Sequence, residues 1–351
     1  MACYFEICVG IFQCLDEAGK PVDWYVLYKL PKLKHHPDSK IADGIAYAYI
    51  TPATIEQGWQ LSEKTVLDPE SIIGQSVSFL YSGERQNEVD DYFWLFYNDQ
   101  PPNELFTEDG HTKGIVAGNS EGGFWLVHSL PRFPVVNVTT YQYPKTGTMY
   151  GQSFLCISMK HQVLDSVGNQ LITNCAHVFN SSFVPELIQK YPTLAKAAMN
   201  KRSTEKKRKE IIYSTENNQF VSFAKSNKFA ADLYSDWLSN ALNSELYVES
   251  WLHEDKLPSA CNETYKVFNV ANVTISSANF GNYHDHSKYV VSANPDESYW
   301  VCIGDINRAS TQFTRGGGTV CMDNKKLWTA YHGMIANVEL CPEICSLHEE
   351  H

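Results

Sequence analysis

The chain has 351 residues, of which 43% are hydrophobic, 13% aromatic and 19% charged. This composition excludes an intrinsically disordered protein, and the length allows one large domain or two closely packed ones. The formal net charge of −12 disfavours a polyanionic partner at neutral pH, but the 12 histidines would cancel it if all were protonated, which becomes possible below about pH 6.

Strands are predicted across the first half of the chain and at the start of the second. Alternating segments rich in aromatic and β-branched residues predict strands at 22–31, 77–83, 92–98 and 151–159. The sequence NDQPP at 98–102 predicts a turn.

Two helices are predicted later in the chain. Residues 183–199 have Pro185 placed for a first turn, and Pro192 must break or kink that helix. Residues 228–242 place three hydrophobic residues at helical spacing, which is typical of core packing; they are Phe229, Leu233 and Trp237. The segment between the two helices, 201–210, contains six Lys or Arg residues and is expected to be a solvated loop, with contact to a polyanion as the alternative.

The cysteines and glycosylation sequons favour the secretory pathway. The ten cysteines form no CxxC pair, which disfavours a zinc ribbon or a thioredoxin-type site. Four N-x-[ST] sequons occur, at Asn137, Asn180, Asn262 and Asn272. Residues 1–13 form at most an atypical leader, because their short hydrophobic stretch lacks a preceding positive charge. We expect no membrane-spanning segment, since no hydrophobic run reaches the roughly 18 residues that one requires.

Two segments that are 175 residues apart match without a gap, 110–127 and 285–302. Each contains His-x-Lys, then an apolar run, an asparagine and a tryptophan, and each predicts two strands joined by a turn. The matched residues include His111 with His286, Lys113 with Lys288, Asn119 with Asn294 and Trp125 with Trp300.

The repeated His-x-Lys predicts a site for phosphodiester cleavage. Residues i and i+2 of a strand point to the same face, so each histidine projects with its lysine, and a pseudo-two-fold axis would bring all four side chains together. One imidazole can attack phosphorus, the other can protonate the leaving oxygen, and the lysines can neutralise the phosphate oxygens without a metal. The candidate catalytic residues are therefore His111, Lys113, His286 and Lys288. Other histidines are expected to be structural or exposed, with His128 and His284 the ones nearest the site.

The sequence resembles the deoxyribonuclease II family of the phospholipase D superfamily. The resemblance extends from about Cys14 to Cys345 and is carried by PVDWYVLYKLP, YNDQPP, GHTKG, GGFWLVHSLPRFP, YGQSFLC, FAKSNKFAADLYSDWL, DHSK, CIGDINR and RGGGTVC. It implies an α/β, phospholipase D-like fold with two pseudo-symmetric halves, each with a mixed β-sheet flanked by helices, around one shared active-site cleft. It also implies metal-independent cleavage of DNA at acid pH, with 3′-phosphate products and no cofactor, in a lysosomal or secreted glycoprotein.

The resemblance further implies three disulfides, Cys14–Cys156, Cys261–Cys341 and Cys302–Cys321. Cys3 and Cys8 would leave with a leader, and Cys175 and Cys345 would pair together or stay free. The aspartate that the superfamily places five residues after the lysine is replaced here by Gly118 and Ala293. In its place, Asn307 of the GDIN sequence is expected to orient the site.

The expected division of the chain is a first half at 14–150 and a second half at 151–351, each with one His-x-Lys. The leading hypothesis is an acid endodeoxyribonuclease. Two alternatives remain: a phospholipase D-like phosphodiesterase that acts on lipid, and a secreted inactive relative that binds nucleic acid or a host protein. Retention of both His-x-Lys pairs argues against the inactive relative, and the absence of an obvious lipid-binding segment argues against the lipid enzyme.

Overall fold

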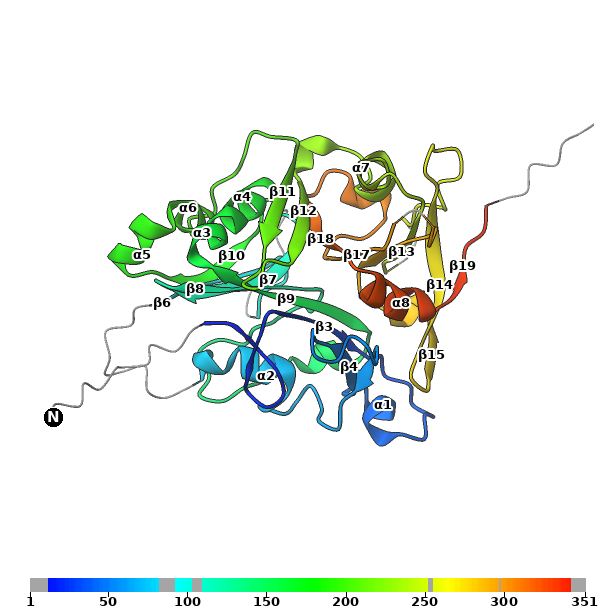
Figure 1. Ribbon diagram of the computed structural model, residues 1–351, viewed down its shortest axis with the longest axis horizontal. Helices are drawn as coiled ribbons and strands as arrows, with labels where there is room; N and C mark the ends of the chain where they lie inside the picture. The colour runs from blue at the N-terminus through cyan, green and yellow to red at the C-terminus, as the bar shows by residue number, and fades with distance from the viewer. Residues whose placement is uncertain (1–11, 82–91, 103–108, 252–254, 297, 342–351) are drawn as a thin grey trace, which may run out of the picture.

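The structure is a computed structural model that describes residues 12–81, 92–102, 109–251, 255–296 and 298–341 (Figure 1). Two large β-sheets form its framework. In strand order, the first contains β10 (Val178–Ser182), β6 (Tyr92–Asn98), β7 (Lys113–Asn119), β8 (Gly122–His128), β9 (Gln152–Lys160), β3 (Trp24–Lys29), β4 (Tyr47–Ile50) and β5 (Gln60–Leu61). The second contains β11 (Lys207–Tyr213), β12 (Gln219–Lys225), β18 (Gly317–Asp323), β17 (Trp300–Gly304), β16 (Tyr289–Ser292), β13 (Leu246–Glu249), β14 (Val267–Ile275) and β15 (Ala278–Gly281), with β19 (Ile335–Val338) paired to β14.

The two sheets match the two halves expected from the repeat, with differences in detail. Recorded pairings within the first sheet are antiparallel, whereas β13 and β14 of the second sheet are parallel, so the mixed sheet expected in each half is found in the second. The first sheet also takes β9 and β10 from beyond residue 150. The domain division at that residue stays a prediction.

Short helices cover the sheets. Four of them, α3 to α6, lie on one side of the first sheet, and α2 lies on its other side (Figure 1). The α-helices are α1 (Ser39–Asp43), α2 (Ile72–Ser76), α3 (His161–Leu164), α4 (Ser166–Thr173), α5 (Pro185–Lys190), α6 (Pro192–Ala198), α7 (Ser239–Leu242) and α8 (Lys325–Gly333). Shorter elements are β1 (Cys14–Leu15), β2 (Pro21–Val22), the 3-10 turns η1 (Ser78–Leu80), η3 (Lys145–Thr148), η4 (Asn227–Phe229), η6 (Asn282–His284) and η7 (Ser310–Gln312), and the π-helical turn η5 (Tyr234–Leu238).

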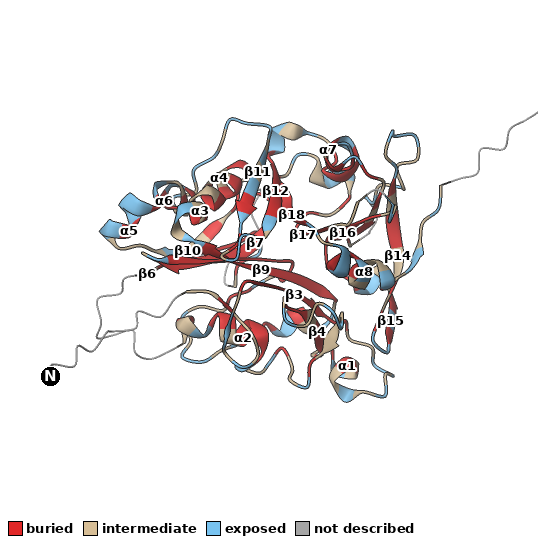
Figure 2. Ribbon diagram, in the orientation of Figure 1, coloured by how far each residue is buried: buried red, intermediate tan, exposed pale blue. Residues whose placement is uncertain are grey.

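Side chains alternate between the two faces of each strand, so a strand can contribute to hydrophobic cores on both sides of its sheet. In β3, Trp24, Val26 and Tyr28 enter the core shared by the two sheets, while Tyr25 and Leu27 enter a second core on the side of α2. A third core lies between the second sheet and η5 with α7. The shared core contains Val116 of β7 and Val291 of β16, so one continuous hydrophobic layer joins the two sheets. Figure 2 shows the buried strands in red.

Several sequence predictions need correction. Of the strand predicted at 77–83, the described part, 77–81, is not a strand: Val77 ends α2, and η1 follows it; residues 82 and 83 lie outside the described residues. The helix predicted over 228–242 begins only at Tyr234, because Ala230 adopts a left-handed conformation (φ 55°) after η4. The basic segment at 201–210 is only partly a loop, since β11 begins at Lys207. The break at Pro192 is confirmed, as α5 ends at Lys190 and α6 begins at Pro192.

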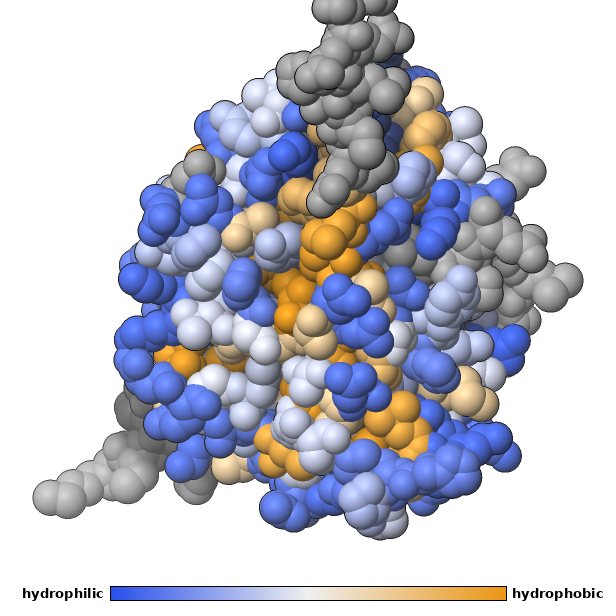
Figure 3. All heavy atoms as spheres, turned by 90° about the vertical axis from the view of Figure 1, so that its right-hand side faces the viewer, coloured by the Kyte–Doolittle hydropathy of each residue, from blue (hydrophilic) through white to orange (hydrophobic). Residues whose placement is uncertain are grey.

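The face of the molecule formed by β14, β15, β19 and α8 carries a band of hydrophobic residues between hydrophilic ones (Figure 3). Leu340 is 75% exposed there and lies next to the disulfide of Cys341. Across the described ranges, no helix is both long and apolar enough to cross a membrane.

Candidate active site

Both His-x-Lys segments lead into antiparallel hairpins. Lys113 is the first residue of β7, which pairs with β8, and Lys288 directly precedes β16, which pairs with β17. His111 and His286 therefore lie just before their strands, where each hairpin begins. The repeat seen in the sequence is thus a repeat of structure.

The tryptophans of the repeat are not equivalent in register. Val116 pairs with Trp125 in the first hairpin, but Val291 pairs with Val301 in the second. A slip of one residue turns a strand's side chains to the opposite face. Accordingly Trp125 lies in the core between the sheets, whereas Trp300 packs against the core on the far side of the second sheet.

The first lysine is held in a buried ion-pair network. The Lys113 ammonium group contacts Oδ1 of Asp99, and Nη2 of Arg315 lies 3.0 Å from Oδ2 of the same carboxylate. Lys113 and Asp99 are only 2% and 1% exposed. Burial acts to raise the pKa of Asp99, but the neighbouring charges of Lys113 and Arg315 hold that pKa below its usual range. The turn after β6 thus supplies the carboxylate that pairs with both Lys113 and Arg315.

A neutral amide orients the first histidine. His111 Nδ1 lies 2.8 Å from Oε1 of Gln312, and its backbone N–H donates to the carbonyl of Gly316. With the amide oxygen as acceptor, Nδ1 carries the proton and Nε2 keeps its lone pair. Gln312 lies at the end of η7, in the loop that joins β17 to β18. The second half of the chain therefore fixes the ring of the first histidine.

Two glycines allow the backbone to approach this histidine closely. A Cβ atom on Gly110 would lie 1.9 Å from the carbonyl oxygen of Asn174, and one on Gly316 would lie 2.0 Å from the same oxygen. The Gly110 N–H also donates to the carbonyl of Cys175. Any side chain at either glycine would therefore displace the segment that carries His111.

Aromatic rings hold the second histidine. The His286 ring stacks on Tyr150 with centroids 4.0 Å apart and an interplanar angle of 5°, and the Trp251 centroid also lies 4.0 Å away. Its Nε2 is buried and has no hydrogen-bond partner in the described part of the chain. The Lys288 ammonium group donates to the His286 carbonyl, and Lys288 is 3% exposed. This imidazole is thus oriented by packing rather than by an amide.

A buried layer of acids and phenols lies beneath the second segment. The Asp285 carboxylate accepts from the Tyr28 hydroxyl and from the Ser287 N–H. Glu249 pairs with Tyr289 across β13 and β16, and neither of its carboxyl oxygens has a partner among the described residues. Burial, and then the charge of Asp285, raises the pKa of Glu249 well above its usual range, which favours the uncharged form of this acid.

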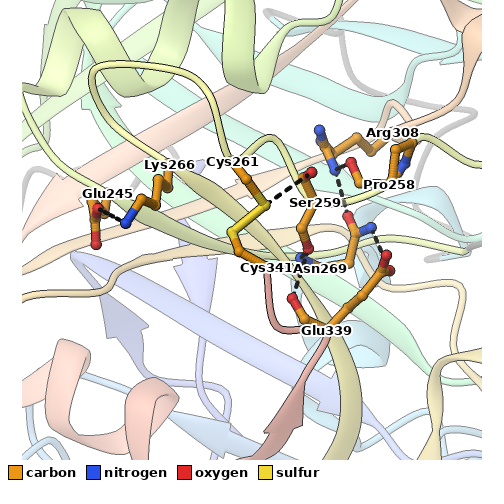
Figure 4. Close-up of a disulfide and its surroundings, with 9 residues drawn as sticks. All are labelled: Glu245, Pro258, Ser259, Cys261, Lys266, Asn269, Arg308, Glu339 and Cys341. Atoms are coloured by element: carbon orange, nitrogen blue, oxygen red, sulfur yellow. Dashed lines mark hydrogen bonds and ion pairs between the residues drawn. A yellow bond between two sulfur atoms is a disulfide. The ribbon is translucent and has the colours of Figure 1, made fainter. Parts of the chain in front are cut away.

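The loop after β17 is anchored by a buried arginine. Arg308 is 2% exposed and donates from Nη1 to the Pro258 carbonyl and to Oδ1 of Asn269, both at 2.7 Å. Asn269 in turn donates to Glu339, beside the Cys261–Cys341 disulfide (Figure 4). The adjacent Asn307 has an Oδ1 that is buried without a partner in the described chain, and its orienting role stays a prediction.

The four candidate residues influence one another electrostatically. Burial, reinforced by Lys113, holds the pKa of His111 well below its ordinary value, and burial followed by Lys288 does the same for His286. Lys288 also contributes to lowering the pKa of His111. Lys113 and His111 both contribute to lowering the pKa of His286. Burial, with Lys113 next, lowers the pKa of Lys288 to about 7. The two segments, distant in the sequence, thus share one electrostatic environment.

Sequence reasoning did not identify Asp99, Gln312 or Arg315 as neighbours of the site. Two of them lie in the quoted stretches YNDQPP and RGGGTVC, which is the signal that could have marked them. His128, expected near the site, is fully buried between Phe133 and Phe154. Within the described ranges, no group of three or more His, Cys, Asp or Glu side chains is placed to hold a metal ion.

All three expected disulfides are present: Cys14–Cys156, Cys261–Cys341 and Cys302–Cys321. Cys175 forms none with another described residue, and Cys3, Cys8 and Cys345 lie outside the described residues.

Two sheets that share a core, each with a hairpin that begins at one His-x-Lys, define a phospholipase D-like protein. A comparison with family models matches residues 13–341 to deoxyribonuclease II. The chain belongs to the deoxyribonuclease II family. It is 32% identical to human deoxyribonuclease-2-beta over 94% of this chain and 91% of the relative. It is 35% identical to mouse deoxyribonuclease-2-alpha over 94% of each chain, and 33% identical to plancitoxin-1 of Acanthaster planci over 94% of this chain and 92% of the relative. The resemblance inferred from the sequence is confirmed.

Proposed function

We propose that this protein is an acid endodeoxyribonuclease that hydrolyses the phosphodiester bonds of DNA without a metal and leaves 3′-phosphate ends. One observation carries the proposal: two imidazoles and two ammonium groups from the two hairpins are close enough to shift one another's pKa. Family membership supports the choice of DNA as the substrate.

The reaction proceeds in two steps. Nε2 of His111 attacks phosphorus, and the leaving 5′ oxygen takes a proton from His286, which gives a 5′-hydroxyl end and a phosphohistidine. Water, deprotonated by His286, then attacks phosphorus and releases the 3′-phosphate and free His111. Lys113 and Lys288 stabilise the charge on the phosphate oxygens throughout. The Gln312 amide suits His111 to the nucleophile's role because it leaves Nε2 unprotonated.

The surroundings of the site favour activity at acid pH. His286 must be protonated to act as the acid, and its lowered pKa confines the imidazolium to low pH. A bound phosphate adds negative charge and raises that pKa towards the working range. Lys288, with a pKa of about 7, loses its charge as the pH rises through neutrality. Both effects reduce activity as the pH increases.

We further propose that the protein works in the lysosome or outside the cell. Three disulfides and four sequons support this, because disulfides persist in oxidising compartments and sequons are used in the secretory pathway.

A plasmid-nicking assay with purified protein tests the activity. We expect conversion of supercoiled plasmid to nicked and linear forms at pH 5 with EDTA present, and radiolabelled ends that are sensitive to a 3′-phosphatase. Phosphohistidine captured by rapid denaturation and located by mass spectrometry should lie on His111. An optimum near pH 7.5 that requires Mg²⁺ would contradict the mechanism. Binding of DNA with no cleavage at any pH would favour the inactive relative.

A further inference from the structure

The edge strand of the second sheet carries exposed lysines at the end that faces the site. Lys206 precedes β11, Lys207 and Lys209 belong to it, and Lys228 lies in η4 directly after β12; all four are exposed. We call these four residues the basic edge. The structure records no ion pair for any of them within the ranges it describes.

The basic edge and the catalytic residues lie at one end of the second sheet. Lys207 pairs with Lys225 of β12, and Lys225 pairs with Gly317, the first residue of β18. Gly304, the last residue of β17, donates its N–H to the carbonyl of Lys288. From β11 to β16 there are four strand spacings of about 4.8 Å, which places the basic edge roughly 19 Å from Lys288.

Specific contacts tie this basic segment to the site from two directions. The Lys225 ammonium group donates to the carbonyls of Gln312 and Arg315, so β12 holds the loop that orients His111. Arg202 forms an ion pair with Asp109, two residues before His111, with Nη2 and Oδ1 2.6 Å apart. The strands and the loop beside the basic edge therefore contact the segments that hold His111.

The balance of charge at this edge is positive. Glu205 and Glu210 are the acids of residues 201–210, and both lie beside Arg208. Asp236, exposed on η5, accepts a hydrogen bond from the backbone of Asp232. The ammonium group of Lys207 lies over the Trp237 ring at 4.9 Å, and that of Lys209 lies 5.5 Å from the Phe223 ring. In an otherwise acidic chain, these lysines are the natural contact for a polyanion.

We propose that the basic edge binds the phosphate backbone of duplex DNA about five to six base pairs from the scissile phosphate. The inference rests on the proposed function. A separation of roughly 19 Å corresponds to that distance because phosphates of one strand advance about 3.4 Å per base pair along the duplex. Lysine–phosphate contacts add affinity without sequence preference and make binding sensitive to salt.

A triple variant tests the proposal: Lys206→Gln, Lys209→Gln and Lys228→Gln. It spares Lys207, whose ammonium group lies over two aromatic rings, those of Phe229 and Trp237. The matched control replaces three other exposed lysines, Lys20, Lys34 and Lys266, which lie on other parts of the molecule. Each protein is assayed at pH 5 for kcat/KM on a 40-base-pair duplex and on bis(p-nitrophenyl) phosphate, at several salt concentrations.

We expect the triple variant to lose roughly tenfold or more in kcat/KM on the duplex at low salt, with no loss on the small diester. Its slope of log kcat/KM against log salt should be shallower by about 0.9 for each phosphate contact removed. Wild-type protein should show the same loss on a short duplex, one that extends fewer than about five base pairs from the scissile phosphate towards the basic edge.

Two outcomes for the triple variant would overturn the inference. One is a kcat/KM and a salt slope on the 40-base-pair duplex that equal those of wild type. The other is an equal loss of kcat/KM on both substrates, which would mean that the lysines support the site itself. If wild-type protein cleaves neither substrate, the proposed function fails instead, and the two failures are thus distinguishable.

Discussion

Replacement of Lys288 by methionine removes a buried ammonium group and keeps a side chain of similar length. Loss of one preorganised charge at a transition state typically costs about 10²- to 10³-fold, so we expect a fall of that size in kcat/KM at pH 5. With a pKa of about 7, wild-type Lys288 is about 99% charged at pH 5 and about 9% charged at pH 8. Its advantage over methionine should therefore shrink as the pH rises.

The measurement is the ratio of wild-type to Lys288→Met kcat/KM at each pH, since a ratio cancels titrations that the two proteins share. This parameter reports groups of the free enzyme, the state to which the pKa of Lys288 refers. The ratio should fall about elevenfold between pH 5 and pH 8, as the charged fraction does. Lys34→Met, an exposed lysine, should give a ratio near one throughout. A ratio that stays constant from pH 5 to pH 9 would refute the reasoning.

Three further predictions concern the paired histidines, a disulfide and the native material. His111→Ala and His286→Ala should each abolish plasmid cleavage, and the double variant should be hardly worse than either, because the residues act as a unit. The exposed His284 provides the control, and two single variants that each keep about half the activity would instead indicate independent sites. Cys14→Ser with Cys156→Ser should lower the free energy of unfolding by up to about 5 kcal/mol, since the bond spans 142 residues; an unchanged urea midpoint would count against this. Protein from its native source should carry N-glycans and no reactive thiols at the six paired cysteines, and mass spectrometry that finds free thiols and no glycan would exclude the proposed compartment.

The fold was predictable where local pattern and core packing agree. β6 and β9 follow their apolar segments closely, and Pro192 separates two helices because proline cannot continue the first. The failures have local causes as well. Val77 and its neighbours are apolar enough for a strand, but Ser71 caps the start of α2, Val77 ends that helix, and η1 follows directly. A left-handed Ala230 delays the next helix by several residues.

Of the candidate site, the sequence predicted only the residues that occur twice, the two His-x-Lys pairs. The His-x-Lys pairs repeat, so the sequence exposes them, whereas Asp99 and Gln312 each occur once and reach the site through the topology of the chain. Gln312 lies 201 residues from the histidine it contacts, and no periodic pattern connects the two. Tyr150 and Trp251, which hold His286, are likewise separated in sequence and meet only in the folded protein.

The two halves of the site use the same residues in unlike surroundings. Lys113 contacts a carboxylate that also binds Arg315, while Lys288 donates to a backbone carbonyl. One imidazole is fixed by an amide oxygen, and the other is held between aromatic rings. Equivalent histidines in a symmetric site would compete for one role, because the proposed reaction needs one neutral ring and one protonated ring. Under the proposed mechanism, these unlike surroundings assign the nucleophile's role to the histidine that Gln312 orients and the acid's role to the histidine that packs on Tyr150.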